Sequence, residues 1–253
     1  MDLSFKTFSK DMPHQTILIV SHERSGTHFL MNSMGKAFGY HSDNWIDLDW
    51  HKVPINYFAS QDITQLMSHF NGQKLANPIK SHHQADFFAP VIEKVFESVA
   101  ILYIYRNPWD VMQSLCRLLN HCEWREGPIC NTPSELMRTE PEGHLMRYQI
   151  KQYHSMLHRW KDHVSGWLEL AKTNDKIVTL CYENLLSDYS STLMKIAEQV
   201  VGMTPKDSIP PDKIHSVISP EETDVAKIPT SVEDKRYINE VSKDLNEKIG
   251  YYF

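Results

Sequence analysis

The sequence predicts an α/β fold in which helices cover both faces of a central parallel sheet. Apolar, β-branched runs alternate with longer segments of helical periodicity along most of the chain, which is the pattern of parallel sheets buried on both faces. Two of the runs, at residues 17–20 and 99–105, end in polar turns that a helical pattern follows. Because such sheets bind ligands beyond the carboxyl ends of their strands, these turns are the first candidates for a site.

The alternation of patterns places the individual elements. No internal repeat, low-complexity tract or long linker interrupts it, so one domain spanning residues 1–253 is the expectation. Residues 40–60 are expected to be irregular, and residues 121–143, with several prolines and glycines, are expected to form a loop or lid beside the site. Strands are predicted at 16–20, 76–80, 99–105 and 176–181, and helices at 27–39, 61–71, 87–97, 108–120, 144–172, 189–201 and 233–248.

Composition argues against several functional classes. The formal net charge of −6 is opposite to what a nucleic-acid-binding face needs. The apolar runs are too short to cross a bilayer, and residues 1–11 lack the apolar core of a signal peptide, so a cytoplasmic protein without membrane contact is expected. Four cysteines without C-x-x-C spacing suit a reduced compartment and predict no metal site.

The segment at residues 17–30 predicts an anion site. Its apolar strand ends in the turn SHERSGT at residues 21–27, and a helix follows. Such a turn presents backbone N–H groups and a helix N-terminus to an anion. Arg24 adds a positive charge, and Ser25 and Thr27 add hydroxyl donors, so a phosphate or sulfate is the expected ligand. The alternative is an ordinary strand-to-helix turn with a surface arginine.

A second candidate anion site follows the strand at 99–105. Arg106 ends that strand, and Pro108 suits the first turn of the next helix. Ser114 lies on the same helix, so Arg106 and Ser114 can converge on a second phosphate. The alternative is an ordinary ion pair between Arg106 and Asp110 at the start of the helix.

Together these segments resemble the sulfotransferases that use 3′-phosphoadenosine 5′-phosphosulfate (PAPS), of the cytosolic type and their bacterial relatives. In that family a K/R-S-G-T turn binds the 5′-phosphosulfate and an R-N-P-x-D-V-x-x-S segment binds the 3′-phosphate. Here these are residues 24–27 and 106–114. Three further stretches agree: K-S-H at 80–82, W-x-x-H-V-x-x-W at 160–167 and Y-E-N-L at 182–185.

The resemblance implies a P-loop-NTPase-like sulfotransferase fold with a PAPS site. PAPS would be the sulfuryl donor, 3′-phosphoadenosine 5′-phosphate (PAP) the product, and no metal would be required. The aromatic rings at positions 29 and 182 would border the adenine. The cofactor-binding residues implied in this way are Arg24, Ser25, Gly26, Thr27, His28, Phe29, Arg106, Ser114 and Tyr182.

Three of the residues in these motifs suit the chemistry of sulfuryl transfer. In-line transfer to a hydroxyl or amine needs a base, positioning and stabilisation of developing charge. His82 is the expected general base, because its ordinary pKa lies near neutrality, and its neighbour His83 is the rival. Lys80, on the same side of the strand, would neutralise the sulfuryl oxygens. Arg24 would stabilise charge on the departing phosphate.

The acceptor and the closure of the donor site are left open by the sequence. Residues 40–58 and 121–143 combine aromatic with acidic side chains, which suits a small polar or cationic acceptor; an acidic, solvated surface is the alternative. The R-K-G-x-x-G-D-W segment that closes over the 3′-phosphate in familiar cytosolic enzymes is missing, which leaves Lys227, Lys235 and Arg236 as basic candidates in that region. The family's short dimer motif is missing too, so the oligomeric state is open.

Two other functions stay open at this point. A nucleotide kinase of the same fold group would need a lysine directly after the last loop glycine and acidic Mg²⁺ ligands, and no lysine follows Gly26. A catalytically inactive binder of PAP or PAPS would keep Arg24, Arg106 and Ser114 but would not need Lys80 and His82.

Overall fold

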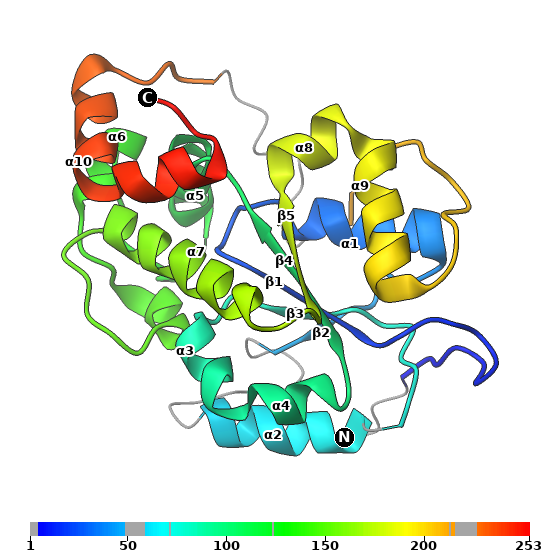
Figure 1. The fold of residues 1–253 in the computed structure, drawn as a ribbon. Helices are drawn as coiled ribbons and strands as arrows, with labels where there is room; N and C mark the ends of the chain where they lie inside the picture. Colours follow the sequence, from blue (N-terminus) through cyan, green and yellow to red (C-terminus); the bar gives the residue numbers. More distant parts are fainter. Residues whose placement is uncertain (1–4, 49–58, 71, 123, 213, 216–226) are drawn as a thin grey trace.

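A parallel sheet forms the centre of the molecule, as a computed structural model shows (Figure 1). The structure describes residues 5–48, 59–70, 72–122, 124–212, 214–215 and 227–253. Within them the strands lie in the order β2-β3-β1-β4-β5, and every neighbouring pair is parallel. The strands are β1 (Ile17–Ser21), β2 (Ile46–Asp47), β3 (Ile79–Ser81), β4 (Ala100–Tyr105) and β5 (Ile177–Cys181).

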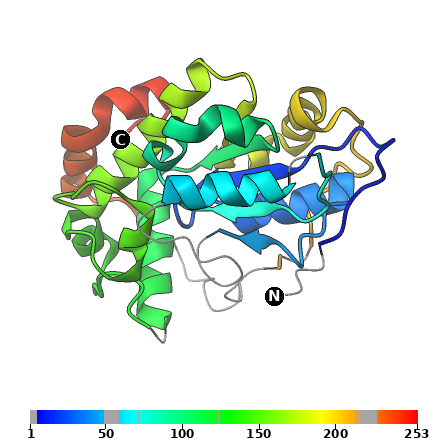
Figure 2. The same cartoon turned by 90° about the horizontal axis from the view of Figure 1, so that it is seen from below.

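Helices cover both faces of this sheet, as Figures 1 and 2 show. The described chain also contains 3-10 turns at Ala89–Val91 and Gly143–Tyr148 and a π-helical turn at Ala197–Val201. The helices are α1 (Thr27–Phe38), α2 (Ala59–Phe70), α3 (Ala85–Phe88), α4 (Ile92–Phe96), α5 (Pro108–His121), α6 (Pro133–Arg138), α7 (Met156–Lys172), α8 (Tyr182–Ser187), α9 (Tyr189–Ile196) and α10 (Val232–Ile249).

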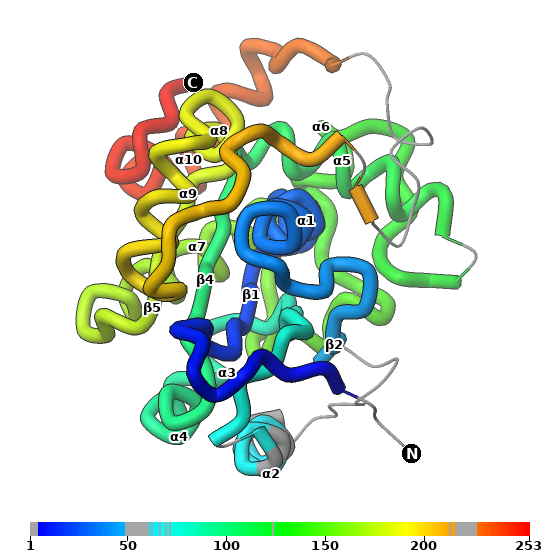
Figure 3. The backbone as a smooth tube through the Cα atoms, turned by 90° about the vertical axis from the view of Figure 1, so that its right-hand side faces the viewer, coloured from blue at the N-terminus to red at the C-terminus, as the bar shows by residue number. Residues whose placement is uncertain are grey.

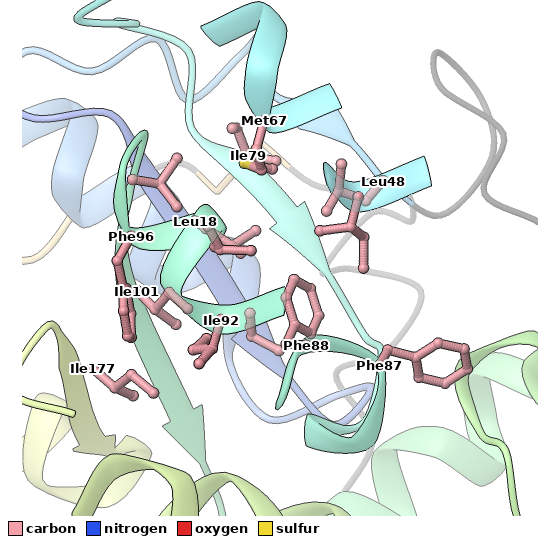
Figure 4. Close-up of a cluster of buried hydrophobic side chains, with 14 of the residues drawn as sticks. Leu18, Leu48, Met67, Ile79, Phe87, Phe88, Ile92, Phe96, Ile101 and Ile177 are labelled. Atoms are coloured by element: carbon pink, nitrogen blue, oxygen red, sulfur yellow. The ribbon is translucent and has the colours of Figure 1, made fainter. Parts of the chain in front are cut away.

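Alternate residues of each strand pack in two separate cores, since successive side chains of a strand point to opposite faces of the sheet. On β1, Leu18 packs in a cluster with side chains of α2, α3 and α4. Figure 4 shows Leu18 in the same cluster as Ile79 and Ile101 of the neighbouring strands, with Ile177 of β5 beyond Ile101. Ile19 packs on the opposite face with side chains of α1, α8 and α9. The near-continuous apolar strands therefore follow from burial on both faces.

A third core gathers α5, α6, α7 and α10. Trp109, Met137, Trp160 and Ile238 contribute one buried side chain each from these four helices. Figures 1 and 3 place α5, α6 and α10 at the opposite end of the molecule from α2 and α4. Because α5 directly follows β4, this helical layer stands next to the carboxyl ends of the strands.

The predicted α/β architecture is confirmed, and the errors concern particular elements. The helix predicted at 144–172 begins only at Met156, where the Ser155 hydroxyl caps it by accepting from the His158 N–H. Residues 121–143 are not all loop, since Thr132 caps α6 and Pro133 occupies its first turn. The helix predicted at 87–97 is divided into α3, a 3-10 turn and α4, and β2 and α8 were not predicted.

The described helices include none with the length and apolar character needed to cross a membrane.

Candidate functional site

The loop between β1 and α1 has an unusual backbone. Arg24 has φ 66° and Gly26 has φ 99°, both in the left-handed region. At position 26 this conformation strongly favours glycine. The ring of Tyr182 also lies so close to Gly26 that any side chain at position 26 would overlap it. The glycine is therefore required by conformation and by the close approach of Tyr182.

The start of α1 keeps hydrogen-bond donors that the chain itself does not use. Gly26 is the N-cap residue and gives no side-chain cap, and the first turn of α1 holds no acidic residue. The Ser25 hydroxyl is buried without a hydrogen-bond partner among the described residues. Buried polar atoms are rarely left unsatisfied. A helix N-terminus with an unpaired hydroxyl beside it suits an anionic group such as a phosphate or sulfate.

Three arginines, Arg24, Arg106 and Arg117, lie in or beside this loop and α5. Arg24 Nε donates to Ser114 Oγ at 2.9 Å. Arg106 approaches the carbonyl oxygen of Arg24 with its Nη1 at 3.4 Å, and its guanidinium lies 4.5 Å from the centre of the Tyr182 ring. Burial, followed by the positive charges of Arg106 and Arg117, lowers the pKa of Arg24. In the described part of the chain no carboxylate pairs with Arg24, so the cluster is suited to an anion.

His82 lies against the same loop, at the end of β3. Its Nδ1 is 2.9 Å from the carbonyl oxygen of Ser21. Because a carbonyl oxygen can only accept, Nδ1 carries the proton and Nε2 has the lone pair. Burial and then the charge of Lys80 lower the pKa of His82 to about 3. The ring is therefore neutral near pH 7 and can accept a proton.

The rival histidine, His83, belongs to the core. It is fully buried, its Nδ1 lies 2.9 Å from Ser81 Oγ, and its ring packs edge-on against Phe87 and Tyr148. His82 is only partly buried. Of the two rings, only His82 lies beside the anion loop and partly open to solvent.

Lys80 has a carboxylate partner that sequence reasoning missed. Its Nζ lies 3.0 Å from Asp47 Oδ2, and both side chains are buried. The two residues are paired in the register of β2 and β3. Asp47 was expected only among the acids of residues 40–58 that could border an acceptor, and its pairing with Lys80 was missed because β2 has two residues and gives no periodic signal. The ammonium of Lys80 is thereby held next to the ring of His82.

His28 and Phe29 lie at the start of α1. Burial and then the charge of Lys80 lower the pKa of His28 to about 3, and its Nδ1 is buried without a partner among the described residues. The Phe29 ring meets the Tyr182 ring edge-on, with centroids 6.1 Å apart. Ser21 Oγ and Thr27 Oγ1 share a hydrogen bond of 2.5 Å. The structure thus brings all of the sequence-predicted site residues together at the carboxyl ends of the strands.

A buried ion pair fixes the anion loop to α7, and the sequence analysis did not identify it as part of the site. Both oxygens of Glu23 accept from Arg159, at 2.7 and 2.8 Å. Arg159 also donates to Gln149 at 2.9 Å and to His22 Nε2 at 2.8 Å, and its side chain is fully buried. The available signal was a pair of opposite charges, one in the loop and one directly before the 160–167 motif.

Three of the acids in residues 121–143 have partners within the protein. Glu126 pairs with Arg147 at 2.9 Å, and Glu142 pairs with Arg125 at 2.7 Å. Glu135 accepts from the backbone of Asn131 and lies in the first turn of α6. These contacts favour the structural interpretation of the acidic residues over a cation-binding border. The aromatic and acidic residues predicted for the acceptor at 49–58 lie outside the described residues.

Comparison with known proteins identifies the family. The sequence profile of the sulfotransferase domain matches residues 14–219. The chain therefore belongs to the sulfotransferase domain family. Among curated protein sequences no match was found. The described residues include no group of three or more His, Cys, Asp or Glu side chains that could hold a metal ion.

Two solved structures share the fold. Mouse sulfotransferase SULT7A1, crystallised with PAP, is 22% identical with a TM-score of 0.51, over 77% of this chain and 60% of the mouse chain. The sulfotransferase domain of the Synechococcus PCC 7002 olefin synthase is 13% identical with a TM-score of 0.53, over 98% of this chain and 99% of that domain. The match thus spans less than two thirds of the mouse protein.

A glycine substitution tests the loop backbone. Gly26→Ala should destabilise the protein more than Gly250→Ala, because both positions have positive φ but only Gly26 is covered by another side chain. Backbone strain alone is worth about 1–2 kcal/mol, and displacement of Tyr182 adds to it. Urea unfolding of both variants measures the difference. Equal losses would show that Tyr182 does not lie on Gly26.

The buried ion pair gives a second prediction. Arg159→Met leaves the Glu23 carboxylate buried without its partner and should cost about 3–5 kcal/mol of unfolding free energy. Arg125→Met removes an exposed arginine that is also paired with a glutamate, and should cost less than about 1 kcal/mol. Similar losses in the two variants would contradict the importance assigned to Glu23 and Arg159.

The same pair predicts an acid-sensitive contribution to stability. Burial by itself would raise the pKa of Glu23, but the charges of Arg159 and His22 lower it well below its ordinary value of 4.5. A depressed carboxyl pKa stabilises the fold above the unfolded pKa, and this stability is lost as pH falls through the folded pKa. The stability advantage of the unaltered chain over Glu23→Gln should therefore shrink below pH 4.5. An advantage that stays constant from pH 7 to the acid transition would contradict it.

Proposed function

We propose that this chain transfers the sulfuryl group of PAPS to a hydroxyl or amine of a small-molecule acceptor, with His82 as the general base. The observation that carries the proposal is the position of His82. Its ring lies on the Ser21 carbonyl at the base of the loop that is suited to an anion. A proton acceptor and an anion site at one strand end are what in-line sulfuryl transfer requires.

The residues that would hold PAPS are those of the loop and of α5. The N-terminus of α1, Ser25, Thr27 and Arg24 would bind the 5′-phosphosulfate, whose bound form supplies the sulfuryl group. Arg106 and Ser114 would bind the 3′-phosphate. The Ser25 hydroxyl, buried without a partner among the described residues, supports the first assignment. The hydrogen bond from Arg24 to Ser114 supports the second, because it holds α5 next to the loop.

The chain's own residues then supply the remaining parts of the reaction. His82 Nε2 accepts the proton of the attacking hydroxyl or amine, since its Nδ1 is occupied by the Ser21 carbonyl. Lys80 offsets negative charge near the sulfuryl oxygens, and Asp47 orients its ammonium. Arg24 stabilises the charge that develops on the departing phosphate.

Direct binding tests the donor site. The chain should bind PAP in the absence of metal in a calorimetric titration, and Arg106→Ala should weaken binding by about tenfold or more, since a charge-assisted contact to phosphate is lost. Arg125→Ala, an exposed arginine elsewhere, serves as the control and should bind as the unaltered chain does. No PAP binding, with ATP bound only together with Mg²⁺, would favour a nucleotide kinase instead.

Turnover tests the role of His82. His82→Ala should reduce sulfuryl transfer from PAPS by about 10²- to 10⁴-fold while PAP binding is kept. His154→Ala, an exposed histidine, should have no effect. The release of PAP from PAPS, with and without candidate acceptors, measures the rate. Unchanged turnover in His82→Ala would remove His82 from the mechanism, and PAP binding without turnover in the unaltered chain would identify an inactive binder.

A further inference from the structure

The turn from β4 to α5 lacks the local acceptor that many helix starts provide for the N–H of the N-cap residue. Asn107 is the N-cap residue of α5, and its side-chain oxygen accepts from the N–H groups of Trp109 and Asp110. In a capping box, the acid at the third helical position accepts the N–H of the N-cap residue in return. Here that acid is Asp110, and its Oδ2 instead lies 3.6 Å from Arg106 Nη2 and 3.6 Å from Lys227 Nζ.

Glu183, in the first turn of α8, supplies the missing acceptor from another part of the chain. Its Oε1 accepts from the N–H of Asn107 at 3.0 Å. Its Oε2 accepts from the hydroxyl of Tyr251 at 2.5 Å and from the thiol of Cys181 at 3.1 Å. Three donors, from the turn before α5, the end of β5 and the residues after α10, thus fix one carboxylate.

Tyr251 is itself held in place. Its side chain is 9% exposed, and its N–H donates to the carbonyl oxygen of Asn246 at 2.8 Å, next to Gly250 at the end of α10. Its ring meets the ring of Tyr105 edge-on, with centroids 6.4 Å apart. Burial and then the charge of Glu183 raise the pKa of Tyr251. The hydroxyl therefore keeps its proton and is a fixed donor to Glu183.

The same turn of α8 also contacts the side chain of Arg106. Tyr182 directly precedes Glu183, and its ring centre lies 4.5 Å from the Arg106 guanidinium. The backbone N–H that Glu183 accepts belongs to Asn107, the residue directly after Arg106. The first turn of α8 thus contacts Arg106 on both its side chain and its following peptide group. The direction in which Arg106 leaves β4 consequently depends on Glu183.

We propose that Glu183 is a positioning residue for Arg106, and that Tyr251 holds Glu183 in this role. The inference rests on the function proposed above, in which Arg106 binds the 3′-phosphate of the donor. Glu183 acts through the turn at Asn107 and not by contact with the nucleotide. Residues 250–253, which follow α10, thereby influence the affinity for a nucleotide that carries a 3′-phosphate.

Tyr251→Phe tests this role, because it removes the hydroxyl donor and keeps the ring in the core. The unaltered chain, Tyr251→Phe and Tyr252→Phe are titrated with PAP and with adenosine 5′-phosphate, which lacks the 3′-phosphate. Tyr251→Phe should weaken PAP binding about three- to tenfold, the range of one hydrogen bond, and should leave adenosine 5′-phosphate binding nearly unchanged. Tyr252→Phe removes the hydroxyl of a neighbouring side chain that is 82% exposed and should alter neither affinity.

Two substitutions of Glu183 test whether Tyr251 acts through it. Glu183→Ala should weaken PAP binding about tenfold or more, whereas Glu183→Gln keeps an oxygen acceptor for the Asn107 N–H and should restore part of that loss. Adding Tyr251→Phe to Glu183→Ala should then have almost no further effect. Fully additive losses of PAP affinity would show that Tyr251 does not act through Glu183.

Amide hydrogen exchange, followed by NMR, tests the hydrogen bond itself without a nucleotide. The Asn107 N–H should exchange slowly in the unaltered chain and in Tyr252→Phe, and faster in Tyr251→Phe and in Glu183→Ala. Equal exchange in all four proteins would contradict the hold of Glu183 on the turn.

The remaining outcomes separate this inference from the proposed function. If the unaltered chain binds PAP and Tyr251→Phe binds it like Tyr252→Phe, the role of Tyr251 is wrong and the donor site stands. Equal losses of PAP and adenosine 5′-phosphate affinity would show a general loss of structure and would overturn the positioning of Arg106. If the unaltered chain does not bind PAP, the proposed function fails and this inference fails with it.

Discussion

The buried ion pair between Glu23 and Arg159 is the interaction on which the site depends. Glu23 is part of a loop suited to an anion, and an unpaired carboxylate there would repel the ligand. Arg159 neutralises it with two short hydrogen bonds, and its remaining N–H groups donate to Gln149, His22 and the carbonyl oxygen of Leu145. Burial of two charges is costly unless their hydrogen bonds are satisfied. Here they are, so the pair fixes the loop to α7 and leaves the charge of Arg24 for the ligand.

The fixed loop in turn positions the other parts of the site. The carbonyl of Ser21 sets the tautomer of His82, and Arg24 connects the loop to α5 through Ser114. His163, on α7, donates to the backbone carbonyl oxygen of His82 at 3.1 Å. This hydrogen bond helps to hold the backbone that carries the proposed base. A small displacement of the loop would consequently change the anion site and the orientation of the base together. This coupling explains why α7 carries both Arg159 and His163 on its buried face.

How far the sequence predicts this structure depends on the distance over which each signal acts. The strands other than β2, and the turns after β1 and β4, were predicted because apolar runs and turn residues are local patterns. Glu23 and Arg159 are 136 residues apart, and nothing local shows that they meet. Asp47 lies in a strand of two residues, too short for a periodic signal. The contact of Lys227 with Asp110 depends on residues 227–230 packing against α5, which is likewise a property of the tertiary structure.

A crystal structure of the chain with PAP tests the proposed donor site, because it locates both phosphates at once. We predict the 5′-phosphate at the N-terminus of α1, in contact with residues 24–27, and the 3′-phosphate between Arg106 and Ser114. His82 Nε2 should then face the side of the 5′-phosphate where the sulfuryl group would be attached. Nucleotide density at another edge of the sheet, or phosphates bound away from this loop and α5, would contradict the account.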